Sequence, residues 1–331
     1  MKAAIVPQYG TPNVIQIEDR PIPKLASKQV LVQIYASVVT TGDWRLRAAA
    51  YPRGLKLVGR MVSGIFKPRH EIPGITYSGI VVAAGSEVTR FAKGDFVFGV
   101  ANKGGHAEYI AVAEDSAIAV KPVEIDFAQA ATLPFGAATA YHFLKRMARV
   151  QPGEKVLVTG ASGGVGHLAV QMAKALGADV TGVASARNDA FVKDLGADHT
   201  VAYETMDLLS QGPVYDVVFD TIGLLDFAKA RKILGKRGRF LVAEGAWREV
   251  FQMMVPWRRN GHRLKFSVSE PDATELEELA AMAKDGLLRP VIEAHFSLDE
   301  IAEAHRAVET RRRRGVIALD IRDQKLSSVA A

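Results

Sequence analysis

The sequence contains no cysteine among its 331 residues. Disulfide bonds and metal sites built on thiolates are therefore excluded. The sequence also lacks an apolar run of the roughly 18 residues that a membrane-spanning helix needs. Residues Met1 to Val6 have the pattern of a short strand and not that of a signal peptide. We therefore expect a cytoplasmic protein.

The chain also has only a small excess of positive over negative charge. The chain has 42 Lys and Arg against 36 Asp and Glu, which gives a net charge of +6, and 48% of its residues are hydrophobic. A chain of this length and composition can bury a large core and form two domains. The slight positive balance suits an anionic small molecule and does not by itself indicate nucleic acid, so we expect no nucleic-acid partner.

A glycine-rich turn is the most informative feature that is present. The β-branched run Lys155–Thr159 predicts a strand, and 167–176 predicts a helix with apolar residues on one side. Between them, small side chains allow a pyrophosphate to approach the unpaired N–H groups of the helix start. Ala161 replaces the first glycine of the usual G-x-G-x-x-G pattern. The residues of this turn expected to contact a dinucleotide are Ser162, Gly163, Gly164 and Val165.

Strands and helices alternate after this turn. Strands are expected at 179–184, 215–220 and 238–242, and helices at 188–196 and 225–234. This alternation predicts an α/β fold with a doubly wound parallel sheet.

The end of the second strand of this sheet carries the cofactor preference. Enzymes that use the unphosphorylated cofactor place Asp or Glu there, where the carboxylate binds the ribose 2′-hydroxyl. Ser185 stands nineteen positions after Gly166, and no acid lies between Val180 and Asn188. Ser185, Arg187 and Asn188 predict a site for the 2′-phosphate of NADPH. The alternative is that Arg187 is an ordinary surface arginine.

The remainder of the chain predicts a second domain. Before residue 120, short strands such as 29–36, 80–83 and 94–99 are separated by Gly, Pro, Asn and Asp, which is typical of a mostly antiparallel β-domain. Helices and strands return at 274–284, 291–296, 298–309 and 316–321. We therefore expect the dinucleotide-binding domain to be inserted, with both ends of the chain in the β-domain.

Several motifs in the same order resemble one known family. They are the glycine turn and the segments Gly104–Tyr109, Ala131–Ala140, Val150–Val158 and Asp194–Asp198. Over nearly its whole length, the chain resembles the zinc-free quinone oxidoreductases and related reductases of the medium-chain dehydrogenase/reductase superfamily. The resemblance implies a GroES-like catalytic domain at 1–122 and 268–331, a Rossmann domain at 123–267, an active site between them and a homodimer.

The resemblance also bears on metal and substrate. The superfamily's Gly-His-Glu ligand motif falls on Gly74–Thr76, its catalytic cysteine falls near Thr40 or Thr41, and the histidines are scattered. We therefore expect no metal site. Without a Lewis acid, the implied reaction is NADPH-dependent hydride transfer to an electron-poor acceptor, a quinone or an α,β-unsaturated carbonyl compound.

Candidate catalytic residues follow from the same resemblance. Thr40, Thr41 and Asp43 occupy the place of a turn beside the nicotinamide in similar enzymes. Tyr51 is a candidate proton donor, with a structural tyrosine as the alternative. Further expected cofactor contacts are Thr139, Tyr203, Ile222, Gly223, Phe266 and Ser267. The arginines of 311–314 either contact phosphate or form a solvated face.

Two basic and aromatic segments have no assigned role. Residues 53–69 and 247–259 have the character of a cover over the cleft or a partner surface, and the alternative is peripheral contact with an anionic membrane. Two other functions also remain open: an enoyl-thioester reductase of a lipid or polyketide pathway, and a non-catalytic NADPH-bound or RNA-binding protein. For RNA, no aromatic stacking platform is apparent.

Overall fold

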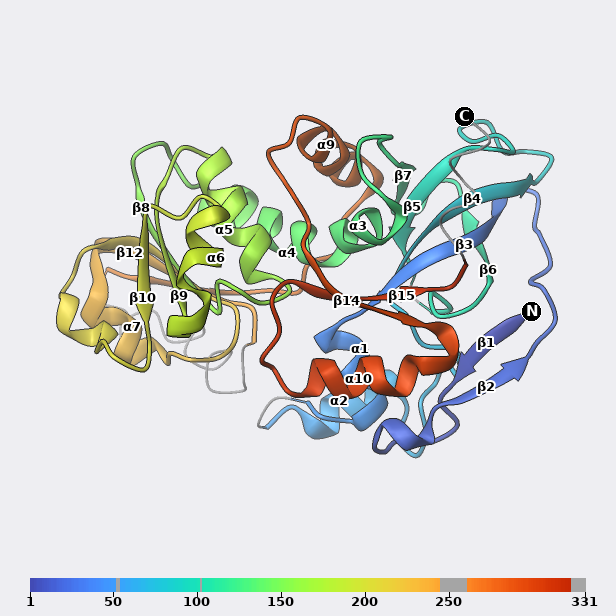
Figure 1. Cartoon of the computed structure of the whole chain (residues 1–331), viewed down its shortest axis with the longest axis horizontal. Coiled ribbons are helices and arrows are strands. Elements are labelled where there is room, and N and C mark those ends of the chain that lie inside the picture. Colours follow the sequence, from blue (N-terminus) through green and yellow to red (C-terminus); the bar gives the residue numbers. More distant parts are fainter. Residues whose placement is uncertain (52–53, 102, 245–260, 323–331) are drawn as a thin grey trace.

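Two separate β-sheets organise the protein, as Figure 1 shows. The structure is a computed structural model that describes residues 1–51, 54–101, 103–244 and 261–322. The segment 247–259, singled out in the sequence, lies within 245–260 and so outside the described residues.

The six-stranded sheet is entirely parallel and has the order β10-β9-β8-β11-β12-β13. Its strands are β8 (Lys155–Thr159), β9 (Asp179–Ala184), β10 (His199–Ala202), β11 (Tyr215–Asp220), β12 (Leu234–Val242) and β13 (Arg263–Phe266). The chain runs outward from β8 to β10 and then returns to β11 on the other side of β8. This reversal opens a crevice at the carboxyl ends of β8 and β11, where ligands of such sheets bind. The predicted doubly wound sheet is confirmed.

Helices cover this parallel sheet because its strands are apolar on both faces. Consecutive residues Val156, Leu157 and Val158 of β8 are all fully buried, as expected for a central parallel strand. The helices between strands are α5 (Gly166–Ala175), α6 (Asp189–Asp194) and α7 (Phe227–Ile233), with the short helices η4 (Ala186–Asn188) and η5 (Leu208–Gln211). They pack the sheet into a rigid base for the turns at its edge.

The seven-stranded sheet is mostly antiparallel, as predicted for the ends of the chain. Its order is β14-β15-β3-β4-β5-β7, with β6 paired to β3, and only β14 and β15 are parallel to each other. The strands are β3 (Gln29–Val39), β4 (Thr76–Ala84), β5 (Phe96–Val100), β6 (Tyr109–Ala113), β7 (Ile118–Val120), β14 (Ile292–Ser297) and β15 (Val316–Asp320). A small antiparallel pair, β1 (Lys2–Ile5) and β2 (Gln16–Asp19), lies beside it. The chain therefore returns to its first sheet after the parallel one.

A helical run joins the two sheets. It consists of α3 (Phe127–Thr132), the π-helical η2 (Leu133–Ala137), α4 (Ala138–Tyr141) and the π-helical η3 (His142–Ala148), and Figure 1 shows α4 between the sheets. The remaining helices are η1 (Pro12–Val14), α1 (Thr41–Ala48), α2 (Lys56–Ser63), α9 (Ala273–Lys284), η7 (Leu298–Glu300) and α10 (Ile301–Glu309). The domain limits at 122/123 and 267/268 fall in connections between elements and stay predictions. In the part of the chain that the structure describes, no helix has both the length and the apolar character needed to cross a membrane.

Candidate functional site

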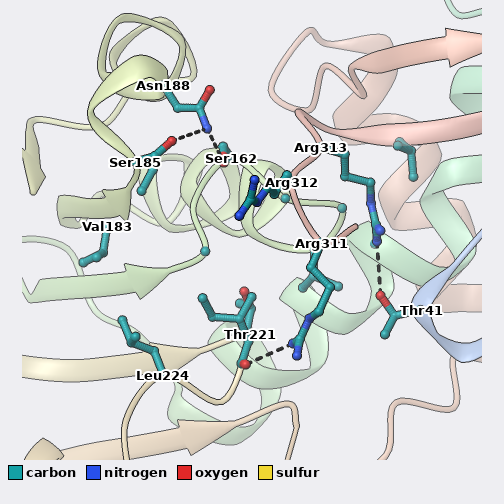
Figure 2. Close-up of a pocket in the computed structure, with 18 of the residues that line it drawn as sticks. Thr41, Ser162, Val183, Ser185, Asn188, Thr221, Leu224, Arg311, Arg312 and Arg313 are labelled. Atoms are coloured by element: carbon teal, nitrogen blue, oxygen red, sulfur yellow. Dashed lines mark hydrogen bonds between the residues drawn. The ribbon is translucent and has the colours of Figure 1, made fainter. Parts of the chain in front are cut away.

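A cavity of about 540 Å³ opens at the carboxyl edge of the parallel sheet. Figure 2 shows its side chains converging from the turn after β8, the end of β9, the turn after β11, the start of α1 and the segment between α10 and β15. The cavity therefore lies where the two sheets meet. Of the residues expected from the sequence, those lining it are Thr40, Thr41, Ser162, Gly163, Gly164, Val165, Ser185, Arg187, Asn188, Tyr203 and Ile222.

The floor of the cavity is the glycine turn. A Cβ on Gly166 would lie 1.9 Å from the carbonyl oxygen of Gly160, so only glycine allows the turn to close this tightly. Gly160 itself has a φ of 62°, and its carbonyl accepts a hydrogen bond from the N–H of Gly163 at 2.9 Å. The turn thus presents backbone, not side chains, at the start of α5, where the helix dipole favours an anion.

Asn188 connects this turn to the end of β9. Its amide nitrogen donates to the hydroxyls of Ser162 at 3.1 Å and Ser185 at 3.0 Å. Its amide oxygen accepts from Nε of Arg314 at 2.6 Å, and the residue is only 4% exposed. Arg187 stands exposed beside it, with one guanidinium nitrogen 3.1 Å from the carbonyl oxygen of Arg312. The predicted phosphate residues therefore form one hydrogen-bonded group.

Arginines dominate the opposite wall. Arg311, Arg312 and Arg313 all line the cavity. The arginines of 311–314 were left open in the sequence between phosphate contacts and a solvated face, and three of the four prove to face the cavity. The guanidinium of Arg313 lies against the glycine turn, 3.2 Å from where a Cβ of Gly164 would stand. Burial lowers its pKa to about 10, so it keeps its charge at neutral pH.

Two carboxylates partly offset these cations. Glu244 forms ion pairs with Arg45 at 3.0 Å and Arg311 at 2.8 Å, so its charge is compensated inside the wall. Glu204 accepts a hydrogen bond from the N–H of Ala186 at 3.0 Å and lines the cavity beside the phosphate residues. Glu204 was not predicted from the sequence, because it follows the third strand of the sheet in chain order, β10, and not the second.

Thr41 faces the cavity from the other sheet. A guanidinium nitrogen of Arg313 donates to its hydroxyl oxygen at 3.1 Å, as Figure 2 shows. Because this hydroxyl accepts from a cation, its own proton remains available to an acceptor in the cavity. Thr41 thus places a hydroxyl in the cavity, with Val38, Thr132 and Phe135 as neighbours in the lining.

Thr40 and Asp43 are hydrogen-bonded to each other at the start of α1. They form the capping box of α1: the Thr40 hydroxyl donates to the Asp43 carboxylate at 2.7 Å and accepts from the N–H of Asp43 at 3.1 Å. The same carboxylate oxygen accepts from the N–H of Thr40 at 2.8 Å. Both side chains are almost fully buried. Although Thr40 borders the cavity, its hydroxyl proton is already engaged, and its predicted catalytic role rests on the resemblance alone.

Tyr51 lies outside the lining of this cavity. Its hydroxyl forms a short hydrogen bond with Ser63, the last residue of α2. Burial raises the pKa of Tyr51, so its phenol stays protonated at neutral pH. Tyr51 thus packs against α2, and its action as proton donor stays a prediction.

The remaining expected contacts are not part of the cavity lining. Thr139 donates to the carbonyl oxygen of Phe135 at 2.6 Å, and Phe135 does line the cavity. Gly223 follows Ile222 in a turn that is held by the buried carboxylate of Asp220, which accepts from the N–H groups of Ile222, Leu224 and Leu225. Phe266 ends β13, and the hydroxyl of Ser267 donates to the carbonyl oxygen of Val268 at 3.2 Å.

These residues fit a dinucleotide. The glycine turn offers a cradle that a single Cβ at Gly166 would disrupt, and Arg313 has a buried Nε without a hydrogen-bond partner beside that cradle. Such an arrangement suits a pyrophosphate. For metals, no group of three or more His, Cys, Asp or Glu side chains within the described ranges is placed to hold an ion, and the absence of zinc stays a prediction.

Comparison with known proteins agrees with this geometry. Residues 26–122 match the model of the alcohol dehydrogenase GroES-like domain, and residues 195–319 match a model described as zinc-binding dehydrogenase. The chain is 30% identical to a 2-methylene-furan-3-one reductase of Solanum lycopersicum, over 96% of this chain and 79% of the relative. It is also 30% identical, with the same coverage, to an NADPH-dependent alkenal/one oxidoreductase of Arabidopsis thaliana.

A solved structure extends the likeness to three dimensions. The quinone oxidoreductase of Coxiella burnetii superposes with a TM-score of 0.86 at 30% identity, over 97% of this chain and 99% of the other. The predicted fold class, a GroES-like domain joined to a Rossmann sheet, is confirmed. The chain belongs to the quinone oxidoreductase-like enzymes of the medium-chain dehydrogenase/reductase superfamily.

Proposed function

We propose that this enzyme is an NADPH-dependent reductase that transfers a hydride to a quinone or an α,β-unsaturated carbonyl compound without a metal. The observation that carries the proposal is the arginine-walled cavity, which reaches from the glycine turn to the hydroxyl of Thr41. One end suits a phosphorylated dinucleotide, and the other suits a neutral acceptor with a carbonyl oxygen.

The preference for NADPH rests on the residues around the end of β9. Ser185, Arg187 and Asn188 offer a hydroxyl, a guanidinium and an amide, and Arg314 lies behind Asn188. Charge-assisted hydrogen bonds from arginine to phosphate are among the strongest in proteins. Glu204 opposes a 2′-phosphate, but it is one carboxylate facing several cations. The Arabidopsis relative is itself described as NADPH-dependent.

We infer the class of acceptor from the side chains that line the cavity near Thr41. Within the described lining, the polar groups on this side are threonines, and the apolar neighbours include Val38 and Phe135. A hydroxyl donor stabilises the negative charge that develops on a carbonyl oxygen during reduction. The relatives from Solanum lycopersicum and Coxiella burnetii carry names of a furanone reductase and a quinone oxidoreductase, which supports either acceptor.

The chain's own residues divide the work of the reaction. The glycine turn and Arg313 hold the pyrophosphate, and the group after β9 holds the adenosine phosphate. The chemistry that the bound cofactor supplies is a hydride. Thr41, polarised by Arg313, donates a hydrogen bond to the acceptor oxygen, and the apolar lining limits the access of water. Orientation and this single donor are the contributions that we assign to the protein.

A substrate panel tests the proposal. The purified enzyme is mixed with NADPH or NADH, and the loss of reduced-nicotinamide absorbance is followed with a short quinone, an enone and an enoyl-coenzyme A thioester. We expect turnover with NADPH and with the quinone or the enone. Turnover with the thioester alone would favour the enoyl-thioester reductase, and binding of NADPH without turnover of any acceptor would contradict a reductase.

A further inference from the structure

Helix α2 is attached to the protein by one narrow side. A Cβ on Gly59 would lie 2.5 Å from the ring of Tyr51, so the helix backbone packs directly on that ring. The Ser63 hydroxyl bonds with the hydroxyl of Tyr51 and lies 3.0 Å from that of Tyr9. Tyr9 also donates to the carbonyl oxygen of Gly64 at 2.6 Å. The inner side of α2 therefore consists of small and polar residues.

The outer side of α2 exposes large apolar side chains. We define the α2 patch as Leu57, Val58, Met61, Val62, Ile65 and Phe66. Phe66 is 89% exposed and Leu57 is 73% exposed, and no residue of the helix is buried. Residues four apart share a helix face, so Leu57 with Met61 and Val58 with Val62 form two adjacent rows. Single exposed apolar residues are ordinary, but six within ten positions, on α2 and directly after it, are a concentration typical of an interaction surface.

Positive charge predominates around the α2 patch. The sequence contains no Asp or Glu between Asp43 and Glu71. The cationic residues within and beside the patch are Lys56, Arg60, Lys67 and Arg69. Arg60 lies over the ring of Tyr9, 4.7 Å from its centroid, and Lys67 forms an ion pair with Glu71 at 3.5 Å. An apolar surface rimmed by these cations requires a partner that is both apolar and negatively charged.

A second copy of the chain does not meet this requirement. In a two-fold symmetric dimer the same surface faces itself, so Lys56, Arg60 and Arg69 of one copy would approach those of the other. An anionic bilayer meets both conditions. Helices with an apolar face and a basic face lie in the plane of the membrane interface, with acyl chains beneath them and anionic headgroups beside their cations.

We propose that the α2 patch docks this protein on the surface of an anionic lipid bilayer. Leu57, Met61 and Phe66 enter the boundary between headgroups and acyl chains, and Lys56 and Arg69 contact the headgroups. Figure 1 shows α2 at the periphery of the molecule, so the patch can approach a flat surface. The attachment is peripheral and reversible, and it does not depend on the reaction that the enzyme catalyses.

Sedimentation with vesicles tests this attachment. The full chain is mixed with vesicles of phosphatidylcholine alone or with added phosphatidylglycerol, and the bound fraction is measured at low and high salt. We expect binding to the anionic vesicles that weakens with salt. The double variant Leu57→Ser and Phe66→Ser should lower the partition coefficient by about tenfold or more, and Lys56→Glu should also lower it.

A matched control distinguishes binding through the α2 patch from non-specific binding through other exposed apolar residues. Val123 and Val268 are 82% and 70% exposed at other sites, and the double variant Val123→Ser and Val268→Ser should bind vesicles as the parent does. Circular dichroism checks that each variant is folded. Equal loss in both double variants, equal binding to neutral vesicles, or no binding of the parent would overturn the proposal. So would a change from dimer to monomer caused by Leu57→Ser and Phe66→Ser without lipid.

Discussion

The Nε2 atom of His167 accepts a hydrogen bond from the N–H of Val291 at 3.2 Å. The Nδ1 atom of the same ring lies 2.9 Å from the carbonyl oxygen of Gly163. Because one nitrogen accepts and the other donates, the ring is neutral with its proton on Nδ1. His167 lies in the first turn of α5, and Val291 immediately precedes β14. Its ring therefore links the helix that follows the glycine turn to the other sheet.

Protonation of His167 in acid should break its hydrogen bond with the N–H of Val291. Burial lowers the pKa of His167 from 6.5 to about 4, so the unfolded chain binds a proton more readily than the folded one. Stability is therefore full above the unfolded pKa and is lost as pH falls toward the folded pKa. The shift corresponds to roughly 3 kcal/mol at most. We expect the free energy of unfolding, measured with urea, to fall between about pH 6.5 and about pH 4, and His167→Gln should flatten this dependence.

Other titratable side chains also change stability with pH, so the His167→Gln variant is needed as a control. Burial also lowers the pKa of His106 and His305, which adds to the loss in acid. Burial raises the pKa of Glu275 to about 7, and its contribution has the opposite sign, since it is lost as pH rises through 7. The difference between parent and His167→Gln isolates one group. Identical pH slopes in the two proteins would show that His167 does not carry the effect.

Arg187→Ala should weaken NADPH binding selectively. Loss of a hydrogen bond to a charged phosphate is worth roughly 1.5–3 kcal/mol, which is about ten- to a hundredfold in the dissociation constant. Binding of NADH, which lacks this phosphate, should change little. Quenching of intrinsic fluorescence during titration measures both constants. An equal loss for the two cofactors would place Arg187 outside the phosphate site.

Glu204→Gln should change NADPH affinity in the direction opposite to Arg187→Ala. Removing this carboxylate, which accepts from the N–H of Ala186, reduces repulsion of the 2′-phosphate. NADPH should then bind more tightly, while NADH binding should weaken or stay constant. The same titration reports both. Weaker NADPH binding in this variant would mean that Glu204 supports the turn more than it repels phosphate.

Thr41→Val should lower turnover. The substitution removes the hydroxyl that Arg313 polarises, and loss of one donor to a developing oxyanion lowers the rate constant by about a hundredfold. Thr41→Ser retains the donor and should stay within a few-fold of the parent. Steady-state rates with a quinone and an enone measure the effect. Similar rates for the valine and serine variants would contradict the role assigned to Thr41.

Thr40→Val provides the neighbouring control. It removes the N-terminal cap of α1, which is worth about 0.5–2 kcal/mol of stability. A lower melting temperature with a smaller effect on turnover than Thr41→Val is the expected result. The reverse order of the two effects on turnover would return catalysis to Thr40, as the sequence resemblance implied.

Zinc should be dispensable. By the resemblance, the Gly-His-Glu ligand motif of zinc-dependent members falls on Gly74, Ile75 and Thr76 here, and the chain has no cysteine. Elemental analysis of the purified protein should find no stoichiometric zinc, and treatment with a chelator should leave the rate unchanged. One tightly held zinc ion per chain, lost together with activity, would refute this.

The strands of the parallel sheet could be predicted closely. The expected bounds 155–159, 179–184 and 215–220 are those of β8, β9 and β11, because each is an apolar run enclosed by turn residues. Strand β10 was not predicted. It has only four residues, begins with His199 and Thr200 and lies at the edge of the sheet, so its sequence lacks the pattern of a buried strand.

The parts of the site that are formed by short continuous segments could be predicted from the sequence. The glycine turn and the group after β9 are short segments whose chemistry follows from neighbouring residues. The contact of Arg313 with Thr41 joins positions far apart in the chain, and no periodicity or motif indicates it. The packing of Tyr51 against α2 was equally hidden, because no pattern in the sequence indicates its hydrogen bond with Ser63.

The pairing of β3 with β15 sets an order of assembly during synthesis. Residues 36–39 of β3 pair with residues 317–320, whereas the parallel sheet is complete once β13 has emerged at Phe266. Domains generally fold as units while the chain is still being made. Strands β3 to β7 can therefore pair with one another as they emerge, whereas residues 36–39 of β3 lack the partner strand β15 until the whole parallel sheet has been made. Since Arg313 immediately precedes β15, the arginine wall of the cavity is among the last parts of the protein to be put in place.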